Sequence, residues 1–423
     1  MLVTKRDGRQ VVFDPHKIEV AITKAYWEEE YFPTHPIHPH AHEIAEKIQN
    51  MDKNLTVEGI QDIVERELML VDPDTAKKYI LYRNKRSKAR EQRGKIFEAM
   101  RRRLDAVAVQ NSNANVDERS FSGREKEASA DIQKIYALEN VLSEEVSNAH
   151  RNMIIYQHDL EKTPIGEHNC LNIDFKKLFE EGFETRNGDI RPPSSFSTAC
   201  QQVAVIFQCQ SQVQFGGVGT VHLDYDLAPF VKKSFIKHIE HYFSDVEGYI
   251  PEHVESEMTQ LRKDYGELTI DNEQFKKDCE HIFRYAYKQL EREMRQSAEA
   301  LYHNLNTLES RAGSQVPFTS INFGRDTSVE GRMVSRVMLN ASLAGIGKHH
   351  KTSIFPISIF QRKRGINANE GDVNYDLQKL ALESLSKRIY PNFCNCDWSQ
   401  AHESIDDPDT YFSTMGKRKL QLI

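Results

Sequence analysis

Hydrophobic positions recur at helical spacing through the first 93 residues. The apolar residues at 11–13 predict a short strand. Asp14 followed by Pro15 predicts a helix start, with Asp14 as the N-cap and Pro15 in the first helical position. Two further helices are predicted, one after Asn54 and one through Arg83. The apolar positions on the faces of these three helices are Ile18, Ala21, Ile22, Ala25, Ile60, Ile63, Val64, Leu68, Ala76, Tyr79 and Ile80.

Polar residues dominate the stretch from 94 to 130. Three consecutive arginines, Arg101 to Arg103, precede an asparagine- and serine-rich run at 111–115, and the polar character continues to Ser129. This composition predicts a linker or an ordered surface arm. The arginines could hold phosphate groups, although a solvated helix face is the simpler interpretation.

Residues 131–423 combine helical and strand patterns. The block opens in helical register, and a charged segment at about 240–300 carries aromatic and aliphatic stripes that predict surface helices. Two later stretches, 318–323 and 353–360, are typical of strands. We therefore divide the chain into residues 1–93, 94–130 and 131–423.

The overall composition argues against several classes of protein. Lysine and arginine number 56 against 63 acidic residues, a formal net charge of −7, which disfavours a globally basic nucleic-acid binder. No run approaches the 18 apolar residues of a membrane-spanning helix, and the first eight residues contain no signal-peptide stretch. We expect a cytoplasmic protein that binds neither membrane nor nucleic acid.

Cysteine is sparse, with six residues in a chain of 423. That number is too low for a disulfide scaffold and predicts free thiols in a reducing compartment. Cys394 and Cys396 alone cannot complete a tetrahedral zinc site, and no C-x-x-C pair occurs. We therefore expect no metal ligands in this chain.

A compact cluster of charged residues opens the chain. Lys5-Arg6-Asp7-Gly8 joins two cations to a glycine turn, and Lys17 follows in the predicted helix. Cations beside a helix N-terminus can hold phosphate groups. Taken alone, the same residues are also typical of the tip of a solvated hairpin.

Four motifs that include this cluster occur in order within the first 93 residues. They are Lys5-Arg6-Asp7-Gly8, Phe13-Asp14-x-x-Lys17-Ile18, Leu55-Thr56-Val57-x-x-Ile60-Gln61-Asp62-x-Val64-Glu65 and Tyr79-Ile80-Leu81-Tyr82-Arg83-x-x-Arg86. Together they resemble the ATP-cone, a small regulatory domain at the front of ribonucleotide reductases. The resemblance implies that ATP or dATP binds as an allosteric effector at Lys5, Arg6, Asp7, Gly8 and Lys17. The alternative is a cone fold that has lost its ligand.

Local signatures are weaker in residues 131–423. A lone cysteine such as Cys170, next to Asn169, is usually a buried small apolar residue. The glycines at 214–219 do not follow a strand, and the glycines at 345–347 lack the spacing of a phosphate loop. Asp224 and Asp226 could pair on a metal, although a helix-capping role is favoured.

Polar side chains stand instead on predicted strands and at their ends, in segments 306–322, 363–367, 374–377 and 388–392. Buried amides and hydroxyls at this density need a polar ligand or a hydrogen-bond network. With the cone and Asn169-Cys170, the order of these segments resembles anaerobic ribonucleoside triphosphate reductase, the glycyl-radical class. The resemblance extends to about Gly416.

The resemblance implies an α/β fold in which a mostly helical ATP-cone precedes the first part of a ten-stranded α/β barrel. It implies radical reduction of ribonucleoside triphosphates to deoxyribonucleoside triphosphates, with Cys170 as a catalytic cysteine on the first barrel strand. A specificity site for a deoxynucleotide is expected around residues 188–240. A homodimer, a glycyl radical, a zinc site and an activase that uses S-adenosylmethionine are implied as well.

The resemblance breaks after Thr414-Met415-Gly416. The family places its radical-bearing cysteine next, but Lys417 stands there, and the radical glycine and the four zinc cysteines have no counterpart. The abrupt change at Lys417 is typical of a frameshift or a premature stop. We expect that the chain alone does not reduce nucleotides. The alternative is an inactive fragment that retains ATP or dATP binding. A cone-bearing transcription repressor is not expected, because its zinc cysteines precede the cone and the first cysteine here is Cys170.

Overall fold

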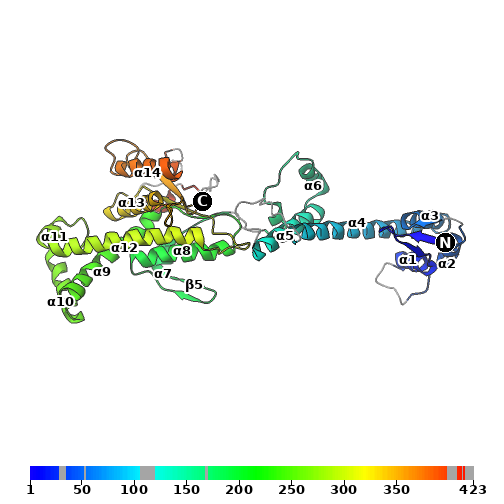
Figure 1. Cartoon of the computed structure of the whole chain (residues 1–423), viewed down its shortest axis with the longest axis horizontal. Coiled ribbons are helices and arrows are strands. Elements are labelled where there is room, and N and C mark those ends of the chain that lie inside the picture. The colour runs from blue at the N-terminus through cyan, green and yellow to red at the C-terminus, as the bar shows by residue number, and fades with distance from the viewer. Residues whose placement is uncertain are drawn as a thin grey trace. The chain divides into compact units, whose positions relative to one another are not determined.

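The computed structural model describes residues 1–27, 35–51, 54–104, 120–166, 170–397, 407–411 and 413–414. The chain forms two compact units, Met1–Asp105 and Ala106–Ile423 (Figure 1). Several residues singled out in the sequence lie outside the described residues, namely Asn169, Met415, Gly416, Lys417 and residues 105–119 of the predicted linker.

The first unit packs helices against a small three-stranded sheet. Strand β1 pairs antiparallel with β2 and parallel with β3. Ile22, Ile48, Val64 and Leu68 are completely buried at the centre of its core. The elements are β1 (Leu2–Thr4), β2 (Gln10–Val12), α1 (Pro15–Trp27), α2 (Ala41–Gln49), β3 (Leu55–Thr56), α3 (Val57–Val71) and α4 (Pro73–Leu104).

Most of the predicted helix positions in this unit are confirmed. Asp14 Oδ1 accepts the backbone N–H of His16 (3.2 Å), so Asp14 caps α1 as predicted. Two differences stand out. Ile80 is 37% exposed and does not belong to the core face of α4. The same helix continues through residue 93 to Leu104, so the first part of the expected linker is helical.

A five-stranded parallel sheet organises the second unit, in the order β10-β9-β8-β7-β4. Helices connect the successive strands, which confirms the expected α/β class. The strands are β4 (Leu171–Ile173), β7 (Val218–Thr220), β8 (Thr319–Phe323), β9 (Ile357–Arg362) and β10 (Asn392–Asn395), with a separate hairpin of β5 (Phe183–Thr185) and β6 (Gly188–Ile190). The helices are α5 (Phe121–Tyr136), α6 (Glu144–Arg151), α7 (Phe175–Glu181), α8 (Phe196–Gln212), α9 (Leu223–His241), α10 (Pro251–Tyr265), α11 (Glu273–Asp278), α12 (Glu280–Thr307), α13 (Val329–Ala344) and α14 (Tyr375–Arg388).

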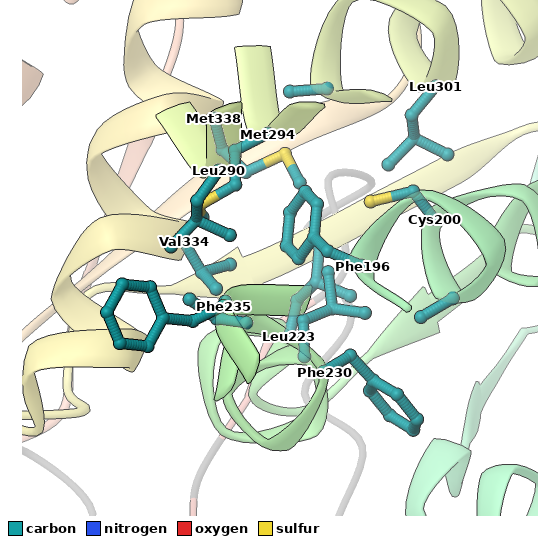
Figure 2. Close-up of a cluster of buried hydrophobic side chains, with 14 of the residues drawn as sticks. Phe196, Cys200, Leu223, Phe230, Phe235, Leu290, Met294, Leu301, Val334 and Met338 are labelled. Carbon is teal, nitrogen blue, oxygen red and sulfur yellow. The ribbon is translucent and has the colours of Figure 1, made fainter. Parts of the chain in front are cut away.

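One face of this sheet is covered by the main hydrophobic core. Side chains of α8, α9, α12 and α13 meet there, and Figure 2 shows Phe196, Phe235, Leu290 and Met338 among them. Residues from the charged 240–300 segment, such as Phe275, belong to this core. The helices expected at the surface therefore contribute buried stripes to the centre of the unit.

The opposite face of the sheet carries polar side chains. Ile321 and Phe323 of β8 join the helical core, so Asn322 between them points the other way. The same alternation places Asn172 of β4 and Gln361 of β9 on this second face. We call the face that carries Asn172, Asn322 and Gln361 the polar face. Asn322 and Gln361 are completely buried, so their amides require hydrogen-bond partners within the fold.

Asp224 connects α9 to the loop after β8. Its Oδ2 atom accepts the backbone N–H groups of Gly324 (2.8 Å), Arg325 (3.0 Å) and Asp326 (3.0 Å), and the hydroxyl of Ser335 (3.2 Å). Burial raises the pKa of this carboxyl, whereas the backbone donors favour its ionised form. This arrangement differs from both roles that the sequence suggested for Asp224, which were a metal pair with Asp226 and a helix cap.

No helix among the described residues is long and apolar enough to cross a membrane.

Replacing Asp224 should destabilise the second unit strongly. Asp224→Ala leaves three backbone donors buried without an acceptor, and we expect a loss of about 3–5 kcal/mol in unfolding free energy. Asp224→Asn keeps one acceptor oxygen and should lose less. Urea unfolding of the full chain measures both, with the exposed Asp189→Ala as the control, which should change little. Equal losses for the alanine and asparagine variants would contradict this role of the acceptor oxygen.

Candidate functional site

The hairpin between β1 and β2 holds four of the five predicted nucleotide-binding residues. The turn closes through Gly8 N–H to Lys5 O (3.0 Å) and Lys5 N–H to Arg9 O (2.8 Å). Gly8 has a φ of +82°, which favours glycine at this position. Asp7 turns back toward Arg9 (Oδ2 to Nε, 2.8 Å), and this hydrogen bond lowers the pKa of Asp7.

Arg6 crosses from the hairpin to helix α3. Its Nε lies 2.6 Å from Glu58 Oε1, and its second guanidinium nitrogen donates to Gln61 Oε1 (3.3 Å). Two arginines of α4 approach the same place. Partial burial lowers the pKa of Arg90, and the positive charges of Arg6 and Arg86 lower it further. Like charges held together in this way are suited to a polyanion.

Lys17 occupies the first turn of α1, where it forms an ion pair with Asp14 (3.4 Å) and remains largely exposed. The structure thus brings Lys5, Arg6, Asp7 and Gly8 together in one turn and places Lys17 on the neighbouring helix. Sequence reasoning missed Arg90. The signal for Arg90 is its distance of four positions from Arg86, which puts both side chains on one face of α4.

Cys170 stands directly before β4, at the start of the parallel sheet. The backbone N–H of Gly217 donates to Cys170 Sγ (3.3 Å), and Gly217 O accepts the N–H of Leu171 (3.1 Å). The glycine-rich turn before β7 therefore fixes the thiol. Because Cys170 and Asn172 are two residues apart on an extended segment, they share the polar face of the sheet.

A cavity of about 960 Å³ opens beside this thiol. It is large enough for a ligand of nucleotide size. Its walls come from α5, from the 158–165 segment and from the loops that precede β7 and β8. The charged and polar lining residues are Ser122, Glu125, Lys126, Glu127, Ser129, Gln133, His158, Asp159, Glu161, Lys162, Arg311 and Gln315.

Charges of both signs line this cavity. Two of the carboxylates have basic partners, because Asp159 lies 2.5 Å from His158 and Glu161 lies 3.7 Å from Lys134. Arg311 stacks on Phe318, with 4.0 Å between guanidinium carbon and ring centroid, and donates to the backbone oxygen of Phe215. Arg311 is thereby held rigidly at the cavity wall. Sequence reasoning noted its segment as polar but did not connect it to Cys170.

A second cavity, of about 610 Å³, lies between α7 and α9. His222 lines it and pairs with Asp226 (3.3 Å). Burial alone would lower the pKa of His222, but hydrogen bonding to Asp226 and the charges of Asp226 and Asp224 outweigh burial and raise it to about 9. This raised pKa favours the imidazolium form of His222 at neutral pH.

Among the residues that the structure describes, no three histidine, cysteine or acidic side chains come together as a metal site.

Comparison with known proteins gives two family matches. A family model described as anaerobic ribonucleoside-triphosphate reductase matches residues 112–420, and one described as the ATP cone domain matches residues 1–88. The anaerobic ribonucleoside-triphosphate reductase of Haemophilus influenzae is 32% identical over 405 residues, which cover 93% of this chain and 52% of the relative. That of Escherichia coli is 32% identical over 404 residues, covering 93% and 51%. The chain spans about half the length of these curated relatives.

Solved structures give a weaker likeness. The anaerobic ribonucleotide reductase from Thermotoga maritima, in complex with dATP and CTP, aligns with a TM-score of 0.41 at 15% identity, over 69% of this chain and 46% of that chain.

The His222–Asp226 pair should make the stability of the second unit depend on pH. The folded-state pKa of His222, about 9, lies above its ordinary value of 6.5. The stabilisation is therefore complete below pH 6.5 and is lost as pH rises toward 9, by about 2–3 kcal/mol. Urea unfolding of wild type and His222→Gln at pH 6 and pH 9 measures the effect. The difference between the two proteins should shrink at pH 9, and a constant difference would contradict the assignment.

Proposed function

The chain belongs to the anaerobic ribonucleoside-triphosphate reductase family, and we propose that it binds ribonucleoside triphosphates for radical reduction to deoxyribonucleoside triphosphates. In this proposal the first unit binds ATP or dATP as the effector, and the cavity beside Cys170 binds the substrate. The observation that carries the proposal is the position of Cys170, which lines a nucleotide-sized cavity at the start of the parallel sheet.

The cation cluster of the first unit supports the effector role. The positive charges of Arg6 and Arg86 act on Arg90, and Arg6 belongs to the hairpin that turns at Gly8. A triphosphate would bring negative charge to guanidinium groups that now repel one another, so binding would relieve this repulsion. Lys5 and Lys17 would add charge on either side. Asp7, turned toward Arg9, would stay clear of the phosphates.

In the substrate cavity, Lys126, Lys162 and Arg311 are the cations suited to phosphate groups. Phe215 and Phe318 offer apolar surface for a base or sugar. A thiol held by the Gly217 N–H would face the sugar. It could pass a hydrogen atom only to a sugar that already carries a radical, because the S–H bond then breaks and leaves the unpaired electron on sulfur. Cys170 would serve as that catalytic cysteine.

The family chemistry also requires a radical and, in its complete form, zinc. The described residues contain no set of metal ligands, and the chain spans about half the length of its curated relatives. We therefore derive no step through either group. A radical activase that uses S-adenosylmethionine, a homodimer and a cytoplasmic location belong to the proposal as what this family membership suggests.

The effector proposal predicts that Arg6 and Arg90 determine nucleotide affinity. Arg6→Gln and Arg90→Gln should each weaken ATP binding by about tenfold or more, because each removes a charge-assisted contact worth about 1.5–3 kcal/mol. Titration calorimetry of the full chain with ATP and with dATP measures this change. Lys77→Gln removes an exposed charge from the same helix and should bind as wild type. Unchanged affinity in both arginine variants would place the nucleotide elsewhere.

The substrate proposal predicts that a ribonucleoside triphosphate shields Cys170. Iodoacetamide labelling of Cys170, followed by peptide mass spectrometry, should slow at least about fivefold when CTP saturates the chain, since a bound sugar covers the thiol. The exposed Cys209 is the internal control and should label at an unchanged rate. Cytidine, which lacks phosphates, should protect much less. Equal labelling of Cys170 with and without CTP would contradict this substrate site.

A further inference from the structure

Two asparagines of the polar face hold a segment from the far end of the described chain. Asn172 Nδ2 donates to Ser413 Oγ (2.7 Å), and Asn322 Nδ2 donates to Thr414 O (3.0 Å). Asn172 belongs to β4 and Asn322 to β8, with β7 between these strands. The segment therefore crosses the polar face over β7, although it is separated from β4 by more than 200 residues of sequence.

These hydrogen bonds are partly buried. Asn322 is completely buried, Ser413 is 5% exposed, and Asn322 Nδ2 also donates to Thr220 O (2.7 Å). A buried amide that loses such an acceptor keeps the full cost of its removal from water. The two asparagines thus favour one docked position of the segment over a solvated one.

Tyr411 anchors the same segment a few residues earlier. It is 4% exposed, and the guanidinium carbon of Arg325 lies 3.4 Å from its ring centroid. Tyr225 packs edge-on against the ring at 5.8 Å between centroids. Arg325 itself is completely buried, so the cation faces the aromatic ring in a dry environment where their attraction is strong.

We propose that Asn172 and Asn322 are positioning residues that fix Ser413 and Thr414 on the polar face, with the buried Tyr411 ring as a nearby anchor. Asn172 and Cys170 share this face, so the segment is fixed on the side of the sheet that presents the thiol. The proposal rests on the proposed function only in treating Cys170 as the reacting thiol.

Hydrogen–deuterium exchange of the full chain tests the docking directly. The N–H groups of Thr410 and Tyr411 donate to Asp407 O (3.1 Å) and Pro408 O (3.0 Å), so peptides covering 407–414 report whether the segment is docked. Asn172→Ala and Ser413→Ala should each speed exchange there by about fivefold, the effect of one neutral hydrogen bond. Asn322→Ala and Tyr411→Leu should speed it by about tenfold or more.

A double-mutant cycle separates positioning from general destabilisation. If Asn172 acts through Ser413, the Asn172→Ala/Ser413→Ala protein should exchange about fivefold faster than wild type, like either single variant. Independent effects would multiply to about 25-fold and would overturn the proposal. Ser413→Ala changes only the segment, so it remains informative if an asparagine variant fails to fold.

The control is Asn306→Ala, since Asn306 Oδ1 holds the backbone of Ile354 (2.8 Å) and Phe355 (3.2 Å) elsewhere in the unit. It should leave exchange at 407–414 unchanged. Faster exchange in Asn306→Ala to the same extent would overturn the proposal, as would unchanged exchange in Ser413→Ala. CTP protection of Cys170 is measured separately. Loss of that protection with the expected exchange pattern would refute the substrate site and leave the positioning role standing.

Discussion

Both faces of a buried parallel sheet must be covered, and in the second unit the two faces carry different kinds of side chain. This constraint organises the second unit. Helices cover one face with apolar side chains such as Phe196 and Phe235 (Figure 2). The other face carries amides, and their burial requires acceptors from other parts of the chain. Asn172 and Asn322 find them in the 413–414 segment. The need to satisfy polar groups thus gathers Cys170 and a distant segment on one side of the sheet.

The proposed binding sites of the two units hold their cations in different ways. In the first unit, partial burial lowers the pKa of Arg90, and the positive charges of Arg6 and Arg86 lower it further. In the second, the cations stand among carboxylates, and Arg311 is fixed by Phe318 and a backbone oxygen. The first arrangement suits an effector that binds and leaves as its concentration changes. The second provides a rigid wall against which a substrate can be oriented.

Local patterns predicted much of the fold. The cap at Asp14, the core stripe through Ile22 and the strands β8 and β9 follow from spacing and neighbouring residues, which act over a few positions. Contacts between distant segments could not be predicted in this way. Asp224 bonds to a loop about 100 residues away, and Asn172 bonds to Ser413 across 241 positions. The candidate site shows the same division, because the motifs identified Arg6 and Cys170 but not Arg90 or Lys126.

The central claim is that the polar side of the sheet, where Cys170 lies, is the working face of the second unit. The most direct measurement is a crystal structure of the full chain with CTP. The account predicts density for the nucleotide in the 960 Å³ cavity, with its sugar against Cys170 and its phosphates near Lys126, Lys162 and Arg311. Nucleotide bound to the second unit on the helical side of the sheet, with this cavity empty, would contradict it.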